Sequence, residues 1–278
     1  MSRGFFESSE FARGSVAMQS LFGLVERVAP TETPLLIVGE PGTRKDALAS
    51  AVHQASARRE APLVTVDCRR PDGESLEVDL FGDERAACTG SGSVEQGAFE
   101  AASGGSVFLA EVGALSHDLQ FKIVRAMEKR EIRRVGGTRW LPVNVRIIAS
   151  TIGNLQKDLN KKRIRADFFY RLTTVELRLP PLRERLEDIP ALVRIIVDEL
   201  GLVEKADAEA LLDPKFLDSL REYSWPGNVR QLRRYIERCV VLGDLNVPPS
   251  VDTIPSVTSG MFRVGKPMRS SKPLANRV

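Results

Sequence analysis

A glycine-rich run between a short apolar segment and a segment of helical composition is the part of the sequence best suited to chemistry. The apolar segment is Leu-Leu-Ile-Val at 35–38, and the run after it is Gly-Glu-Pro-Gly-Thr-Arg-Lys-Asp at 39–46, here called the phosphate loop. In a strand–turn–helix unit of this kind, backbone N–H groups and the helix N-terminus face an anion. The residues expected to contact a nucleotide are Gly39, Gly42, Thr43, Arg44, Lys45 and Asp46.

The phosphate loop departs from the general pattern at two positions. The pattern requires Gly, four residues, Gly, Lys and then Ser or Thr. Gly39, Gly42 and Lys45 fit, but Arg44 stands at the second required glycine and Asp46 replaces the hydroxyl residue. Taken alone, the run is therefore compatible both with phosphate binding and with an ordinary strand–turn–helix connection.

Composition and charge limit the class of protein. The 278 residues are 42% hydrophobic and 28% charged, which suits one large globular domain or two smaller ones. A net charge of +3 is too balanced to indicate a nucleic acid by itself. No apolar run approaches the roughly 20 residues that span a bilayer, and no signal-peptide core is present, so we expect a cytoplasmic protein without membrane contact. The three cysteines and two histidines lack the spacing of a disulfide framework or a zinc site.

The rest of the chain predicts strands that alternate with helices, followed by helices alone. The five expected strands are residues 35–38, 62–66, 106–110, 145–149 and 175–179. Such alternation favours a largely parallel α/β sheet covered on both faces. The later helices are expected at about 189–200, 216–220 and 229–242. We therefore predict a flexible arm at 1–9, an α/β domain at 10–178, a helical lid at 179–245 and a disordered basic tail at 246–278.

Further motifs occur in a fixed order along the chain. They are Leu80–Gly82 leading into 86–91, Gly104–Glu111, Arg134–Gly137, Arg165–Leu172, Leu179–Arg185 and Trp225–Arg230. Together with the phosphate loop, they resemble the central ATPase domain of bacterial sigma-54-dependent activators, the enhancer-binding proteins of the AAA+ class. The resemblance covers roughly residues 10–243. It implies an AAA+ P-loop nucleotide-binding domain with a five-stranded parallel sheet and a small all-helical lid.

The resemblance also implies roles for individual residues. Glu111 matches the carboxylate that orients the attacking water, and Arg230 matches a lid arginine that reaches the nucleotide, which is ATP. Arg165 and Arg171 match arginines that reach the neighbouring subunit of a ring. The alternative for these two arginines is surface ion pairing with Asp167 or Glu184, which contributes little to stability.

The departures from the family pattern occur at positions that serve ATP hydrolysis and contact with the sigma factor. Ala110 stands where the family carries the aspartate that organises Mg²⁺, whose charge neutralises the developing phosphate charge. Arg44 replaces a glycine that lets the backbone approach phosphate, although a guanidinium can itself contact an anion. Ile152 and Asp67 each stand where an Asn is usual, and Cys88 replaces the Phe that engages the sigma factor. We therefore expect ATP binding with weak or lost hydrolysis, and Mg²⁺ binding stays open.

Three functions are compatible with these residues. The first is an ATP-binding AAA+ module of transcription regulation with weak or lost hydrolysis. The second is an active ATPase that remodels sigma-54 RNA polymerase, against which Ala110 and Cys88 count. The third is a non-enzymatic protein that joins or inhibits rings of an intact relative. The expected partners are the chain itself or a related activator subunit, with sigma-54 polymerase as a further candidate. No DNA-binding domain is expected, because residues 246–278 lack an amphipathic helix pair.

Overall fold

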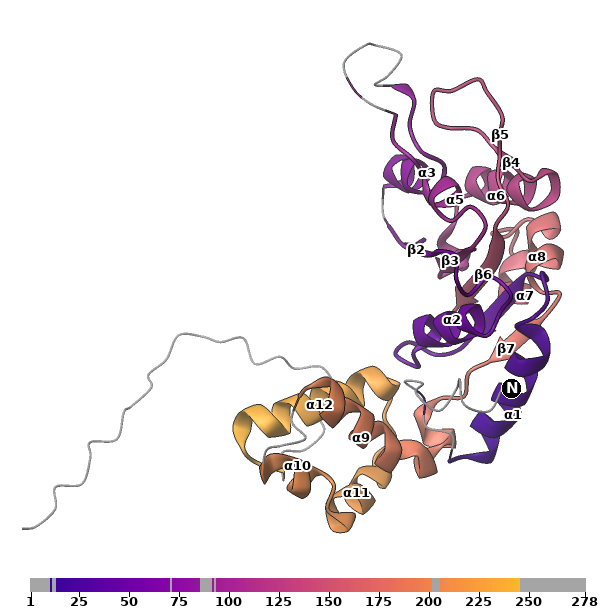
Figure 1. Ribbon diagram of the computed structural model, residues 1–278. Helices are drawn as coiled ribbons and strands as arrows, with labels where there is room; N and C mark the ends of the chain where they lie inside the picture. Colours follow the sequence, from indigo (N-terminus) through magenta and orange to yellow (C-terminus); the bar gives the residue numbers. More distant parts are fainter. Residues whose placement is uncertain are drawn as a thin grey trace, which may run out of the picture. The chain divides into compact units, whose positions relative to one another are not determined.

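The computed structural model of the chain describes residues 11, 14–70, 72–85, 92, 94–201 and 206–245 (Figure 1). The expectations for the arm at 1–9, the sigma-factor loop at 86–91 and the basic tail at 246–278 lie outside these residues. Within the described part of the chain, no helix is both long enough and apolar enough to cross a membrane.

A five-stranded parallel sheet forms the centre of the α/β part, as predicted. Its strands are β1 (Leu35–Val38), β2 (Leu63–Asp67), β3 (Ser106–Ala110), β6 (Arg146–Thr151) and β7 (Glu176–Arg178). They lie in the order β2-β3-β6-β1-β7, and every pairing is parallel. The carboxyl ends of β1, β3 and β6 therefore open onto one edge of the sheet, where ligands of open α/β sheets bind.

Successive side chains of β1 point to opposite faces of the sheet, as the two-residue period of a strand requires. Leu35 and Ile37 belong to the core formed with α1 (Val16–Val28) and α2 (Lys45–Gln54), whereas Leu36 belongs to the core on the other face. That second core contains residues of α3 (Gly73–Phe81), α5 (Ala98–Ala101), α6 (His117–Lys129), α7 (Leu155–Asn160) and α8 (Ala166–Leu172). The sheet is thus covered on both faces (Figure 1).

Two serines that precede apolar periodic segments act as helix caps. The Ser15 hydroxyl accepts a hydrogen bond from the Met18 amide at the start of α1, and the Ser116 hydroxyl accepts one from the Leu119 amide at the start of α6. These bonds satisfy amide groups that the first turn of a helix leaves without intrahelical partners.

The second part of the fold is helical and has its own core. Its elements are the 3₁₀ turns η2 (Leu182–Glu184) and η3 (Leu186–Asp188) and the helices α9 (Ile189–Glu199), α10 (Ala206–Leu211), α11 (Pro214–Arg221) and α12 (Asn228–Leu242). Trp225 is fully buried at the centre of this core. Its indole N–H donates to the Leu220 carbonyl at 2.7 Å, and its ring packs edge-on against Tyr235. We call this part the lid.

Some boundaries differ from the prediction. The helix expected after the phosphate loop begins within it, at Lys45, because the last residues of the loop already form its first turn, and it ends at Gln54. A two-stranded antiparallel pair, β4 (Glu131–Ile132) and β5 (Leu141–Pro142), was not expected. Strands of two residues are too short to produce a recognisable alternation of apolar and polar side chains.

Candidate functional site

The phosphate loop joins the carboxyl end of β1 to the N-terminus of α2, and its turn depends on Gly42. This residue has a φ of +80°, and a Cβ built on it would lie 2.2 Å from the Gly227 carbonyl oxygen and 3.1 Å from the Arg230 Cβ. A side chain at Gly42 is therefore excluded both by its backbone conformation and by the adjacent lid. The Thr43 hydroxyl closes the turn by donating to the Glu40 carbonyl at 2.8 Å.

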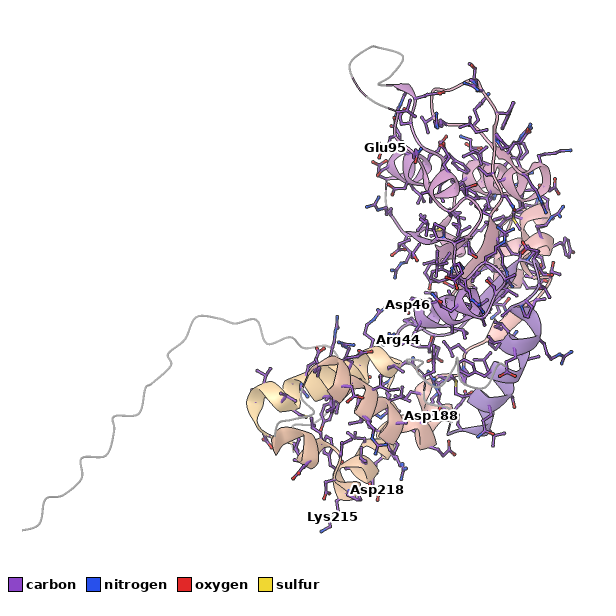
Figure 2. The ribbon with its side chains drawn as sticks, viewed as in Figure 1. Arg44, Asp46, Glu95, Asp188, Lys215 and Asp218 are labelled. Carbon is purple, nitrogen blue, oxygen red and sulfur yellow. The ribbon has the colours of Figure 1, made fainter. Side chains whose placement is uncertain are left out.

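Arg44 keeps the backbone conformation that a glycine would adopt without strain. Its φ of +72° and ψ of +50° lie in the left-handed region, and it occupies the N-cap position of α2. A residue with a Cβ in this region costs about 1 kcal/mol relative to glycine. The shape of the loop thus survives the substitution, and a half-buried guanidinium-bearing residue stands at the start of the helix beside Asp46 (Figure 2).

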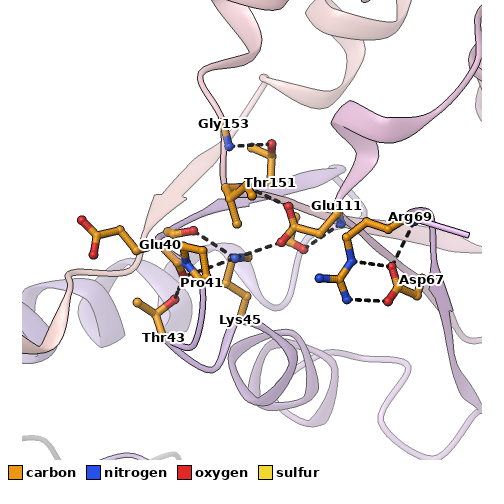
Figure 3. A network of polar contacts seen from close by, with 12 residues as sticks. Glu40, Pro41, Thr43, Lys45, Asp67, Arg69, Glu111, Thr151 and Gly153 are labelled. Carbon is orange, nitrogen blue, oxygen red and sulfur yellow. Dashed lines mark hydrogen bonds and ion pairs between the residues drawn. The ribbon is translucent and has the colours of Figure 1, made fainter. Parts of the chain in front are cut away.

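Lys45 and Glu111 are the two charged groups at the centre of the site (Figure 3). The buried Lys45 ammonium donates to the Gly39 carbonyl at 2.9 Å and lies 3.0 Å from Glu111 Oε1. The other oxygen of Glu111, Oε2, accepts a hydrogen bond from the Ile152 amide at 2.9 Å. Both carboxylate oxygens of Glu111 are therefore engaged, one by the phosphate loop and one by the residue after β6.

Ile152 is a site residue that sequence reasoning missed. Its side chain is exposed and has no polar group, so the sequence indicates only that the usual asparagine is missing. Its backbone N–H nevertheless supplies a donor to Glu111. No signal in the type of side chain could have revealed this contact, because the donor belongs to the backbone.

Asp67 does not take part in holding Glu111. Its carboxylate accepts bonds from the Arg69 guanidinium at 2.9 and 2.6 Å and from the Arg69 amide at 3.0 Å (Figure 3). The hydrogen bonds from Arg69 lower the pKa of Asp67, so the carboxylate is charged at neutral pH. The hydrogen bonds of the Asp67 carboxylate described here are thus local, to Arg69 two positions further along the chain.

The donor set does not fit a Mg²⁺ ion held by protein carboxylates. Mg²⁺ at nucleotide sites is usually held by one or two carboxylates together with the phosphates. Ala110 ends β3 without a carboxylate, and the remaining acid, Glu111, already has both oxygens engaged. Among the described residues, no cluster of three or more His, Cys, Asp or Glu side chains could hold a metal ion.

Arg230 lies next to the phosphate loop through its backbone and its Cβ. Its backbone N–H donates to the Gly42 carbonyl at 3.2 Å, and its Cβ borders Gly42. The side chain is exposed. The structure therefore brings Arg230 to the same site as Lys45 and Glu111.

Arg165 and Arg171 lie on a different element and are both paired within the chain. Arg165 precedes α8, and its guanidinium donates to Asp167 at 3.0 and 2.8 Å, as the surface-pairing alternative predicted. Arg171 pairs with Glu128 instead of Asp167 or Glu184, so that part of the alternative is wrong. Glu128 lies 43 positions before Arg171, near the end of α6, and sequence spacing could not indicate it.

Comparison with known proteins places this geometry in a family. The model of the sigma-54 interaction domain matches residues 11–178, and that of an AAA+ ATPase lid domain matches residues 183–259. The chain belongs to the sigma-54 interaction domain family. The first match spans the sheet, the phosphate loop, Glu111 and both arginines on and before α8, and the second spans Arg230.

Relatives within this family are transcription regulators. The chain is 42% identical to the DNA-binding transcriptional activator HyfR of Escherichia coli K12, covering 82% of this chain and 34% of HyfR. It is 41% identical to the transcriptional regulatory protein ZraR of the same organism, covering 82% of this chain and 52% of ZraR. The chain thus spans about a third to a half of these proteins.

A solved relative has the same fold. The crystal structure of NtrX from Brucella abortus in complex with ATP matches with a TM-score of 0.74 and 35% identity, covering 87% of this chain and 53% of that chain. The predicted fold, an α/β domain with a five-stranded parallel sheet followed by a helical lid, is therefore confirmed.

Proposed function

We propose that this chain is a sigma-54-activator-type AAA+ module that binds ATP in the cytoplasm and takes part in bacterial transcription regulation. The observation that carries the proposal is the buried Lys45 ammonium, held within a phosphate loop whose left-handed turns at Gly42 and Arg44 are intact. The NtrX structure in complex with ATP supports the choice of ligand, because that protein shares this fold.

Each residue of the loop has a distinct part in holding the phosphates. Gly39 and Gly42 allow the backbone to approach the anion, and Thr43 fixes the turn through its bond to the Glu40 carbonyl. Lys45 and Arg44 supply positive charge, and Arg230 reaches the nucleotide from the lid. Asp46 lies in the first turn of α2, where an acidic side chain stabilises the helix dipole.

Hydrolysis in this module is weak or lost. Glu111 is engaged by Lys45 and by the Ile152 amide, and Ala110 removes the carboxylate that would position a metal ion. Catalytic residues that act as a unit lose most of their effect when one member is missing. The chain's own residues thus favour binding and orientation of ATP over its turnover.

A second candidate function is to join or inhibit rings of an intact relative, and the surface around Arg165 favours it. Arg165 lies over the ring of Phe121, which is 51% exposed, and Tyr170 on α8 is 70% exposed. Arg165 and Arg171 would reach the nucleotide of the next subunit, either another copy of this chain or a related activator. Head-to-tail contacts of this kind build rings.

Nucleotide-induced thermal stabilisation tests the proposed binding. A ligand at a hundredfold excess over its Kd stabilises the folded state by about 2.7 kcal/mol. We expect millimolar ATP or ADP to raise the melting temperature of the chain and to leave that of Lys45→Ala unchanged. A melting temperature of the unaltered chain that ATP and ADP do not move would contradict the proposal.

A further inference from the structure

Glu40 places a carboxylate inside a loop that is built to receive an anion. Its side chain is turned to the lid, where Arg183 of η2 donates to Oε2 at 2.8 Å and to Oε1 at 2.6 Å. Asn228, the first residue of α12, donates to Oε2 at 3.2 Å. One carboxylate of the phosphate loop is therefore held by two separate segments of the lid.

Asn228 ties these lid segments to each other and to the loop backbone. Its side chain is fully buried, its Oδ1 accepts from the Leu182 amide at 2.8 Å, and its Nδ2 also donates to the Pro41 carbonyl at 3.0 Å. The Arg230 amide donates to the next carbonyl along the loop, that of Gly42. The lid thus contacts residues 40–42 both through the Glu40 carboxylate and through the backbone carbonyls of Pro41 and Gly42.

The stability of the fold does not account for the Glu40–Arg183 pair. The two side chains are 39% and 45% exposed, and ion pairs with this much access to water contribute little to stability. The hydrogen bonds from Arg183 lower the pKa of Glu40, so the loop carries this negative charge at neutral pH. A negative charge beside an anion site by itself repels the anion and weakens its binding. The presence of Glu40 in this loop therefore needs another explanation.

The geometry of the contact between Glu40 and the lid supplies this explanation. Among ordinary protein side chains, only a carboxylate can accept both N–H groups of a guanidinium fork and a third donor at the same time, and such bidentate pairs fix orientation as well as distance. We infer that Arg183 and Asn228 are positioning residues that act through Glu40, holding the phosphate loop in the shape that binds a nucleoside polyphosphate. The inference rests on the proposed function, since the loop must be the nucleotide site.

The lid contact and nucleotide binding then stabilise each other. Coupling between two binding events is reciprocal, so a contact that favours the binding-competent loop is itself favoured when phosphate binds. Plain electrostatics and positioning make opposite predictions for Glu40→Gln. Removal of a negative charge alone would tighten ATP binding, whereas loss of the contact that shapes the loop weakens it.

A double-mutant cycle on ATP affinity tests the inference. We would measure ATP and ADP binding by calorimetry for the unaltered chain, Glu40→Gln, Arg183→Gln and the double variant. Each single variant is expected to bind about fivefold more weakly, the upper limit for a half-exposed ion pair, and the double variant no more weakly than either single one. Arg183→Lys keeps the charge without the fork, and we expect an intermediate affinity.

Arg221→Gln is the matched control. Arg221 is also on the lid, is 41% exposed and is ion-paired to Asp218, and within the described part of the chain it makes no hydrogen bond or ion pair with the phosphate loop. Its substitution should leave ATP affinity unchanged, and melting of the free proteins verifies that all variants fold. Tighter binding by Glu40→Gln, or losses that multiply in the double variant, would overturn the inference while leaving the proposed function intact. Absence of binding by the unaltered chain would overturn both.

Discussion

Lys45 Nζ and Glu111 Oε1 lie 3.0 Å apart, and the two side chains are only 9% and 12% exposed. The ammonium that would hold a phosphate and the carboxylate that would orient a water are therefore engaged with each other. An incoming phosphate must displace Glu111 from the Lys45 ammonium, because the three N–H donors of a lysine cannot serve a phosphate and all their present acceptors at the same time. This competition sets the first prediction.

Glu111→Gln should tighten ATP binding. The neutral amide holds the Lys45 ammonium less strongly than a carboxylate does, because a charge-assisted hydrogen bond is roughly twice as strong as a neutral one. We expect the Kd for ATP to fall about fivefold, equivalent to about 1 kcal/mol. Calorimetry at constant ionic strength measures it, and weaker binding by the variant would show that Glu111 does not compete for Lys45.

Arg44 should contribute its charge and not its backbone conformation. Arg44→Gly removes both the guanidinium and the strain, whereas Arg44→Asn removes the guanidinium and keeps a residue that tolerates the left-handed region. We expect both variants to bind ATP about threefold to tenfold more weakly, within the range of a hydrogen bond to a charged group. Arg44→Gly should also unfold at the same or a slightly higher temperature. Unchanged affinity in both variants would remove Arg44 from the site.

His53 should make the fold sensitive to mild acid. Its side chain is 1% exposed between the Ser106 hydroxyl, 2.9 Å away, and the Ala61 carbonyl, 3.0 Å away. Burial lowers the pKa of His53, and this effect outweighs the hydrogen bond to the Ala61 carbonyl, which raises it; the nearby Arg146 charge adds to the lowering. The unfolded chain therefore binds a proton before the folded chain does. Stability is fully present above the ordinary histidine pKa of about 6.5 and is lost as the pH falls below it.

The two histidines of the chain allow a matched comparison for this effect. Denaturant unfolding between pH 7.5 and about 5.5, above the range of ordinary carboxylates, should show a decline in the free energy of unfolding of the unaltered chain. That decline should be smaller in His53→Gln, whereas exposed His117→Gln should behave as the unaltered chain does. An equal decline in all three would mean that His53 is not the titrating group.

Arg165 and Arg171 should promote assembly. With a non-hydrolysable ATP analogue, we expect the unaltered chain to sediment as oligomers, alone or mixed with an intact activator domain, and the variant with Arg165→Ala and Arg171→Ala to remain smaller. Their partners within the chain, Asp167 and Glu128, are half-exposed, so release from these pairs costs little. A chain that stays monomeric under both conditions would contradict the assembly proposal.

The sheet and most helices could be predicted because their signals are local. The strand Ser106–Ala110 contains a run of four apolar residues, 107–110, shortly after two glycines. The lid helix α12 carries Leu232, Ile236 and Cys239 on its buried face, as its helical period indicated. Local signals also located the phosphate loop, whereas Arg230 was indicated by the resemblance to the family. The parallel pairing of the strands was favoured by their alternation with helices, whereas their order in the sheet was not predicted.

The contacts that complete the site could not be predicted because they join distant parts of the chain. Glu40 and Arg183 are separated by 143 positions, and no periodicity links them. Glu111 is restrained by the backbone of Ile152, a donor that every residue except proline carries. Asn228 reads as an ordinary helix start, yet it lies fully buried against the phosphate loop.

The central claim is that the site holds ATP without turning it over, and a single-turnover measurement tests it most directly. Protein in excess over labelled ATP, with Mg²⁺ present, would be trapped on a filter and the bound nucleotide identified. After about ten seconds, long enough for many turnovers at ordinary enzyme rates of about 1 per second or faster, the bound label should still be ATP. Ala110→Asp should raise the rate without restoring it fully, and Lys45→Ala should retain no label. Bound label converted to ADP by the unaltered chain within that time would contradict the account.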